Sequence, residues 1–128
     1  MSSDFLTPAD VSVETLKGVF DDAFLETSLE GDDLLYVKDG NYGCYVVPSQ
    51  SGEDIRFVGF ATPNDQATEE QRLRFANRAN QSYKIVRTYV AENGRLVFDY
   101  YVALNPGITK KALILTFKRF VVIPLEIL

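Results

Sequence analysis

The chain has 128 residues, of which 46% are hydrophobic and 24% charged, and its formal net charge at pH 7 is −5. This balance is typical of one globular domain, residues 1–128, and no apolar run is long enough to cross a membrane as a helix. The sequence contains no histidine, which removes the commonest general base and metal ligand. The single cysteine, Cys44, excludes an internal disulfide and a structural zinc site.

The charge is unevenly distributed along the chain. Residues 1–62 carry 12 acidic and 3 basic side chains, whereas residues 63–128 carry 6 acidic and 10 basic ones. An acidic chain is poorly suited to general nucleic-acid binding, because phosphate contacts need a basic surface. The first residues lack a basic region followed by an apolar block, so we expect no signal peptide and a cytoplasmic protein with no membrane partner.

The first half of the sequence predicts a helix and then four strands. Thr7 can cap a helix that has Pro8 at its first position and ends near Asp21-Asp22. Short β-type runs divided by turn residues follow at 24–29, 34–38, 42–47 and 54–61. The connections are too short for crossover helices, so the four strands should form an antiparallel meander.

The second half begins with a helix and continues with a hairpin. Thr68 and Gln71 have the spacing of a capping box, which predicts a helix to about residue 81. Strands at 83–91 and 95–104 flank Asn93-Gly94, a strong signal for a two-residue type I′ turn. Such a turn would place Tyr89 opposite Phe98 and Thr88 opposite Asp99.

The chain should end in a third helix and an apolar tail. Pro106-Gly107 breaks the last strand, and Thr109 caps a helix from Lys110 to about Phe120. The tail, Val121 to Leu128, contains a proline. The complete order α-β-β-β-β-α-β-β-α indicates an α+β domain with an antiparallel sheet and helices packed mainly on one face.

This order and several short motifs resemble the YbjN family of small bacterial proteins, described as sensory-transduction regulators. The resemblance covers residues 8–121. The motifs that carry it are Asn77 and Asn80, Tyr83-Lys84-Ile85, Asn93-Gly94, Asp99-Tyr100, Pro106-Gly107-Ile108-Thr109 and Lys118-Arg119-Phe120. The resemblance implies a fold similar to class I secretion chaperones, which are small acidic proteins, many of them dimers that bind extended client segments. It implies no catalytic residues and no cofactor.

Two asparagines and the hairpin are the candidate functional residues. Asn77 and Asn80 lie one helical turn apart, so they could recognise a peptide backbone, but bonding to the neighbouring strand or helix end is the favoured interpretation. Both faces of the hairpin are apolar, so something should cover the second one. We expect a homodimer there, or else coverage by the apolar tail. The residues assigned to this interface are Val86, Val90, Val97 and Tyr101, with Thr88 and Asp99 as polar members.

Other polar clusters favour structural interpretations. The acidic turn around Gly31 lacks the spacing of a calcium loop, and Cys44 alternates with apolar neighbours as a core residue does. The chain therefore predicts a non-enzymatic, chaperone-like domain that binds a protein client or partner. The alternative is a small-ligand sensor with an apolar pocket between the sheet and a helix. An open groove would favour the first function, and an enclosed pocket the second.

Overall fold

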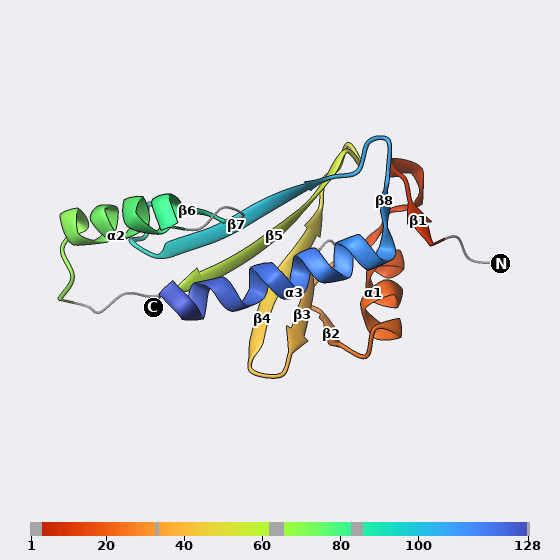
Figure 1. The fold of residues 1–128 in the computed structure, drawn as a ribbon, viewed down its shortest axis with the longest axis horizontal. Coiled ribbons are helices and arrows are strands. Elements are labelled where there is room, and N and C mark those ends of the chain that lie inside the picture. The colour runs from red at the N-terminus through yellow and green to blue at the C-terminus, as the bar shows by residue number, and fades with distance from the viewer. Residues whose placement is uncertain (1–3, 33, 62–65, 83–85, 128) are drawn as a thin grey trace.

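The computed structural model describes residues 4–32, 34–61, 66–82 and 86–127, which form an α+β domain (Figure 1). Their helices and strands follow in chain order. They are β1 (Phe5–Leu6), the 3-10 helix η1 (Pro8–Asp10), α1 (Val13–Asp22), β2 (Glu26–Leu29), β3 (Leu35–Asp39), β4 (Tyr42–Pro48), β5 (Asp54–Ala61), α2 (Glu69–Ser82), β6 (Arg87–Val90), β7 (Leu96–Ala103), β8 (Ile108–Thr109) and α3 (Lys110–Ile127).

One six-stranded antiparallel sheet organises the fold, in the order β2-β3-β4-β5-β7-β6. The predicted meander is present from β2 to β5, and β7 then pairs with β5 along eight residues of each strand. This pairing leaves β6 at one edge of the sheet and β2 at the other. A two-stranded ribbon of β1 and β8 joins the N-terminal segment to the start of α3.

Helices α1 and α3 lie on the same side of the sheet, as Figure 1 shows, and the hydrophobic core lies beneath them. Phe57 of β5 is fully buried there, with its ring 5.9 Å from those of both Phe117 and Phe120 of α3. Phe20 of α1 meets Phe117 edge-on at 5.2 Å. Helix α2 instead lies alongside the edge strand β6. The prediction of an antiparallel sheet with helices mainly on one face is confirmed.

The first helix starts later than the sequence suggested. The predicted capping box forms, since Thr7 N donates to Asp10 Oδ2 at 3.1 Å, but it closes only the 3-10 turn η1. The α-helix begins after Ser12, whose hydroxyl accepts from Thr15 N at 3.1 Å. It ends at Asp22, as predicted, in a turn where Phe24 takes a left-handed φ of 65°.

The β6–β7 hairpin differs from the predicted one by one residue. Ala91 N donates to Arg95 O and Gly94 N donates to Ala91 O, both at 2.9 Å, so the loop has three residues. Gly94 has a φ of +83°, and Asn93 is not among the described residues with positive φ, which rules out a type I′ turn. The longer loop pairs Arg87 with Asp99 and Thr88 with Phe98. The predicted pairing of Thr88 with Asp99 was therefore wrong.

The predicted apolar tail is the last part of helix α3. Thr109 caps this helix as expected, with its hydroxyl accepting from Ala112 N at 3.0 Å, but the helix continues to Ile127. Val121 and Ile123 are 3% and 5% exposed and belong to the core under α3. The tail therefore does not fold back over the other face of the sheet. Among the described residues, no helix is both long and apolar enough to cross a membrane.

Candidate functional site

The strand register gathers the candidate site on the face of the sheet opposite α1 and α3. Cross-strand partners share a face, and successive residues of a strand alternate between faces. We call this surface the open face. Its three rows across the strands are Tyr36, Tyr45, Val58, Asp99 and Arg87; Val47, Arg56 and Tyr101; and Phe60, Val97 and Tyr89.

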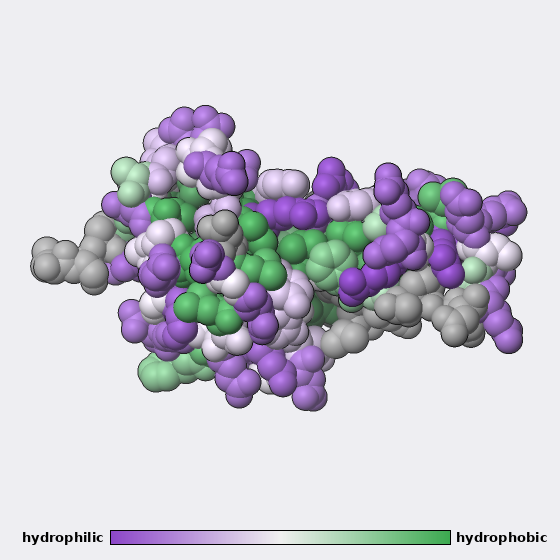
Figure 2. Space-filling model, turned by 180° about the vertical axis from the view of Figure 1, so that it is seen from behind, coloured by the Kyte–Doolittle hydropathy of each residue, from purple (hydrophilic) through white to green (hydrophobic). Residues whose placement is uncertain are grey.

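The open face is hollowed and apolar in its middle, with hydrophilic residues around that area (Figure 2). Its aromatic side chains are half exposed, with 49% of Tyr101, 44% of Phe60 and 37% of Tyr89 accessible to solvent. Val58 and Val97 lie between them and are almost fully buried. The face thus has a packed centre surrounded by accessible rings, an arrangement found in protein-binding surfaces.

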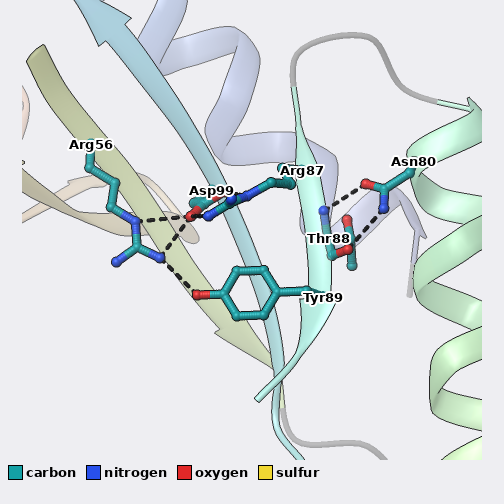
Figure 3. A network of polar contacts seen from close by, with 6 residues as sticks. All are labelled: Arg56, Asn80, Arg87, Thr88, Tyr89 and Asp99. Carbon is teal, nitrogen blue, oxygen red and sulfur yellow. Dashed lines mark hydrogen bonds and ion pairs between the residues drawn. The ribbon is translucent and has the colours of Figure 1, made fainter.

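A carboxylate with two arginines stands at one end of this face (Figure 3). Asp99 of β7 is completely buried, and both of its oxygens accept hydrogen bonds. Arg56 of β5 donates to Oδ2 from Nε at 2.9 Å and from Nη2 at 2.7 Å. Arg87 of β6 donates from Nε to Oδ1 at 2.9 Å and from Nη2 to Oδ2 at 2.7 Å. The register sets this geometry, because it places Arg87 directly opposite Asp99.

Two tyrosines complete the network. The Tyr89 hydroxyl accepts from Arg56 Nη2 at 3.0 Å, and the Arg87 guanidinium lies 5.0 Å from the Tyr89 ring centroid. Tyr101 lies beneath both guanidinium groups, at 5.7 Å from Arg56 and 5.8 Å from Arg87. Such cation–π contacts hold the planar guanidinium groups in place on the sheet.

The charges of the network reinforce one another. Burial alone would lower the pKa of Arg56, but the hydrogen bonds and charge of Asp99 outweigh it and the net pKa shift is upward. Hydrogen bonding to Asp99 likewise raises the pKa of Arg87 above its usual value. Both arginines therefore stay cationic at any physiological pH, and the three groups together carry a net charge of +1.

An aromatic row extends the site towards β3. The Tyr36 and Tyr45 rings meet edge-on with centroids 5.0 Å apart, and Tyr45 meets Phe60 in the same way at 6.2 Å. The Arg95 guanidinium lies 4.6 Å from the Phe60 ring centroid. Burial raises the pKa of the Tyr36 phenol, so the Tyr36 hydroxyl stays protonated at physiological pH.

The two predicted asparagines have different surroundings. Asn80 bonds the outer edge of β6, with Thr88 N donating to its Oδ1 at 2.7 Å and its Nδ2 donating to Thr88 O at 2.9 Å (Figure 3). Of the two structural alternatives, bonding to a strand or to a helix end, Asn80 shows the first. Asn77 instead lines a surface hollow of about 650 Å³ on α2 with Gln71, Arg74 and Arg78.

The four residues assigned to an interface do not share one face. Val90 pairs with Leu96, on the core side of β6, whereas Val97 and Tyr101 lie on the open face. Val86 and Val97 are 6% and 2% exposed, so within the chain they are already buried. Of the four, only Tyr101 is well exposed. The error comes from the turn, because a one-residue shift moves every side chain of a strand to the opposite face.

Of the remaining candidates, one has a structural role and another includes a residue outside the described part of the chain. Cys44 is 1% exposed, and burial raises the pKa of its thiol far above the usual value, so it is an inert core residue. The acidic turn includes Asp33, which lies outside the described residues. Arg56 was missed altogether. Its signal is a basic side chain between the apolar Ile55 and Phe57, and the β5–β7 register places it on the same face as Asp99.

Comparison with known proteins gives the family and the fold. No curated protein matches the sequence significantly. Residues 12–123 match the YbjN family, described as "Putative bacterial sensory transduction regulator". Among solved structures, the fold is similar to that of YbjN from E. coli, described as "a putative transcription regulator". The TM-score is 0.72 with 16% sequence identity, and the likeness covers 94% of this chain and 93% of that one.

At 16% sequence identity the structural similarity supports the fold alone, so the family assignment depends on the sequence match. The matched residues include those of the open face, from Tyr36 of β3 to Tyr101 of β7. The match also agrees with the motif order noted in the sequence. Because it spans most of the chain, this protein belongs to the YbjN family.

Proposed function

We propose that this chain is a non-enzymatic, cytoplasmic regulatory domain that binds a protein partner or client on its open face, as a chaperone does. One observation carries the proposal. The open face has accessible Tyr101, Phe60 and Tyr89 side chains, while the other face of β5 and β7 carries the fully buried core residues Phe57 and Phe98. Apolar surface that is left accessible and bordered by polar residues marks interaction sites in soluble proteins.

The residue types on the open face support a protein partner. Tyrosine and arginine are enriched among the residues that dominate protein–protein binding energy, because they combine a large apolar contact area with hydrogen-bond donors. Here Tyr101 lies under two guanidinium groups that Asp99 holds in position. Pre-ordered side chains lose little conformational entropy on binding, which favours their use as anchors.

The chemistry of the site supports binding over catalysis. The Asp99 carboxylate receives four hydrogen bonds from two arginines, so it is not available to accept a proton from a substrate. The chain has no histidine, and its only thiol is buried. The family is described as one of regulators.

The alternative function, a small-ligand sensor, has less support. It needs an enclosed pocket between the sheet and a core helix. Two hollows that are lined by described residues, one of about 650 Å³ on α2 and one of about 470 Å³ between α2 and the β6–β7 turn, both open to solvent. Neither hollow lies under α1 or α3. The open face is thus the better supported site.

Site-specific cross-linking tests the proposal. A photoreactive phenylalanine analogue replaces Tyr101 on the open face, and a matched variant carries it at Leu115, which is 55% exposed on α3. Cross-linking in the native host should yield a protein adduct from position 101 that is missing from position 115. The identified partner is then purified, and its affinity for the intact chain is measured.

The variants of the purified pair decide the outcome. Tyr101→Ala should weaken binding about tenfold or more, as loss of an interface anchor does, whereas Leu115→Ala should leave it unchanged. Equal adducts from both positions, or a purified partner that binds Tyr101→Ala as tightly as the intact chain, would refute a binding role for the open face.

A further inference from the structure

Three donor atoms of the Asp99 network meet no acceptor within the described part of the chain. Arg56 and Arg87 each direct Nε and Nη2 to Asp99, and among the described residues neither Nη1 meets an acceptor. The Tyr89 hydroxyl accepts from Arg56, so its own proton points elsewhere, and no acceptor for it lies in the described part of the chain. A cluster that offers only donors is suited to an anion.

The charge of the cluster points the same way. Two guanidinium groups face one carboxylate, which leaves one positive charge although the whole chain carries −5. Asp99 already receives four hydrogen bonds, which is about the number that a carboxylate can accept, so it cannot neutralise more. The remaining charge is accessible, since the side chain of Arg87 is 59% exposed and that of Arg56 28% exposed.

The surroundings of the cluster select the kind of anion. Tyr89 and Tyr101 adjoin the guanidinium groups, and the apolar centre of the open face lies beside them. An anionic group with apolar neighbours fits this combination. A nucleic acid would bring many phosphates to an acidic protein, which opposes binding. A second copy in a two-fold contact centred here would place Arg56 and Arg87 against their own equivalents, which repel.

We propose that Arg56, Arg87 and Tyr89 form a carboxylate-binding site for an Asp or Glu side chain that lies between apolar residues of the partner. This inference rests on the partner-binding function proposed above and names the chemistry of that partner. The free Nη1 groups and the Tyr89 hydroxyl bind the incoming carboxylate, while Asp99 keeps both guanidinium groups in register. The neighbouring apolar side chains of the partner then contact Tyr101 and the centre of the open face.

Two blocked peptides that differ by one charge test this site. Acetyl-Leu-Glu-Leu-amide and acetyl-Leu-Gln-Leu-amide are titrated separately into the intact chain with isotope-labelled arginine, and the Nε–H signals of Arg56 and Arg87 are followed by NMR. The Glu peptide should bind about tenfold more tightly, the effect of one charge-assisted contact. Its advantage should shrink as salt is added.

Three variants assign the preference to the cluster. Arg87→Gln should remove it, while Arg74→Gln should keep it, because Arg74 pairs with Glu70 on the surface of α2, away from the Asp99 network. Tyr89→Phe, which removes one hydroxyl and leaves the fold intact, should reduce it by about threefold. Equal binding of the two peptides, or equal losses in Arg87→Gln and Arg74→Gln, would overturn the carboxylate site and leave the partner-binding function standing.

The two proposals fail separately. Cross-linking at position 101 could yield no specific partner while the intact chain still binds the Glu peptide more tightly than the Gln peptide and Arg87→Gln does not. In that case the cluster is a carboxylate site and the partner-binding function is refuted. If a partner binds through Tyr101 and the peptides bind equally, the partner uses the aromatic part of the open face and the carboxylate site is refuted.

Discussion

Arg87 lies directly across the β6–β7 ladder from Asp99, and its Nη2 is 2.7 Å from the Asp99 Oδ2. This contact depends on the three-residue turn at Gly94, which sets the register four residue pairs away. A two-residue turn would have placed Thr88 there and moved Arg87 out of line with the carboxylate. The turn at the tip of the hairpin therefore determines the electrostatics of the open face.

Removing the charge of Asp99 should destabilise the fold. Asp99→Asn leaves two guanidinium groups without an anion and turns an amide NH2 towards them. Breaking a buried ion pair costs about 3–5 kcal/mol, and here about 2–3 kcal/mol is expected because Arg87 is largely exposed and can be rehydrated. Urea unfolding measures this loss. The Glu70→Gln variant breaks an exposed pair with Arg74 and should change stability by less than about 0.5 kcal/mol.

The observed turn predicts different costs for substituting its two central residues, Asn93 and Gly94. In a type I′ turn both residues would have positive φ. Gly94 has a φ of +83°, which a β-branched residue resists, so Gly94→Val should cost more than about 1 kcal/mol. Asn93 accepts an exposed hydrogen bond from Arg95 N on its Oδ1, so Asn93→Ala should cost less than about 1 kcal/mol. Equal losses of unfolding free energy in the two variants would contradict the observed turn.

Most of the fold follows from local patterns, and the site does not. Capping residues such as Thr68 and Thr109 locate helix starts because the signal lies within four residues, and both caps form. The pairing of β5 with β7 joins residues about 43 positions apart, and no local pattern specifies it. Arg56 and Asp99 each stand between two apolar or aromatic neighbours in the sequence, and only that pairing shows why both charges are tolerated.

The errors in the predicted site have one cause. Asn93-Gly94 indicates a hairpin but does not determine the number of residues in its loop. A glycine with positive φ occurs in both two- and three-residue loops. The one-residue difference reversed the faces of β6, so Val90 was grouped with Val97 and Tyr101. The continuation of α3 was missed because the predicted helix ended at about Phe120 and the residues after it, which include Pro124, were assigned to an apolar tail, although the helix extends to Ile127.

The edge of the sheet offers a test of Asn80. Its amide bonds both polar groups of Thr88 that point away from β7, which covers part of an edge strand. Asn80→Ala should cost about 1–2 kcal/mol of unfolding free energy and speed hydrogen exchange at Thr88 N–H. Asn77→Ala on the same helix is the matched control and should stay within about 0.5 kcal/mol. Equal effects would show that the bond does not stabilise β6.

Truncation after Phe120 should unfold the protein or greatly lower its free energy of unfolding. It removes Val121 and Ile123, which are 3% and 5% exposed in the core under α3. Loss of two buried aliphatic side chains costs about 3 kcal/mol or more. The thermal midpoint measured by circular dichroism reports the loss. A truncated chain that keeps the midpoint of the intact protein would show that the end of α3 contributes nothing to the core.

The homodimer expected from the sequence stays a prediction, but its surface changes. Val86 and Val97 are buried within the chain, so Val97→Glu would disrupt folding and cannot serve as a test of association. The arginines repel their own equivalents, so a two-fold contact should lie towards Phe60 and Tyr45, away from the Asp99 network.

Light scattering on the intact chain over a range of concentrations measures the association directly. A dimer is expected, and Phe60→Ser should convert it into a folded monomer, because Phe60 is 44% exposed and its ring can be removed without opening the core. Leu73→Ser, which removes a side chain 52% exposed on α2, is the matched control and should remain dimeric. If the intact chain is monomeric at every concentration, or if Leu73→Ser dissociates it and Phe60→Ser does not, the open face does not mediate self-association.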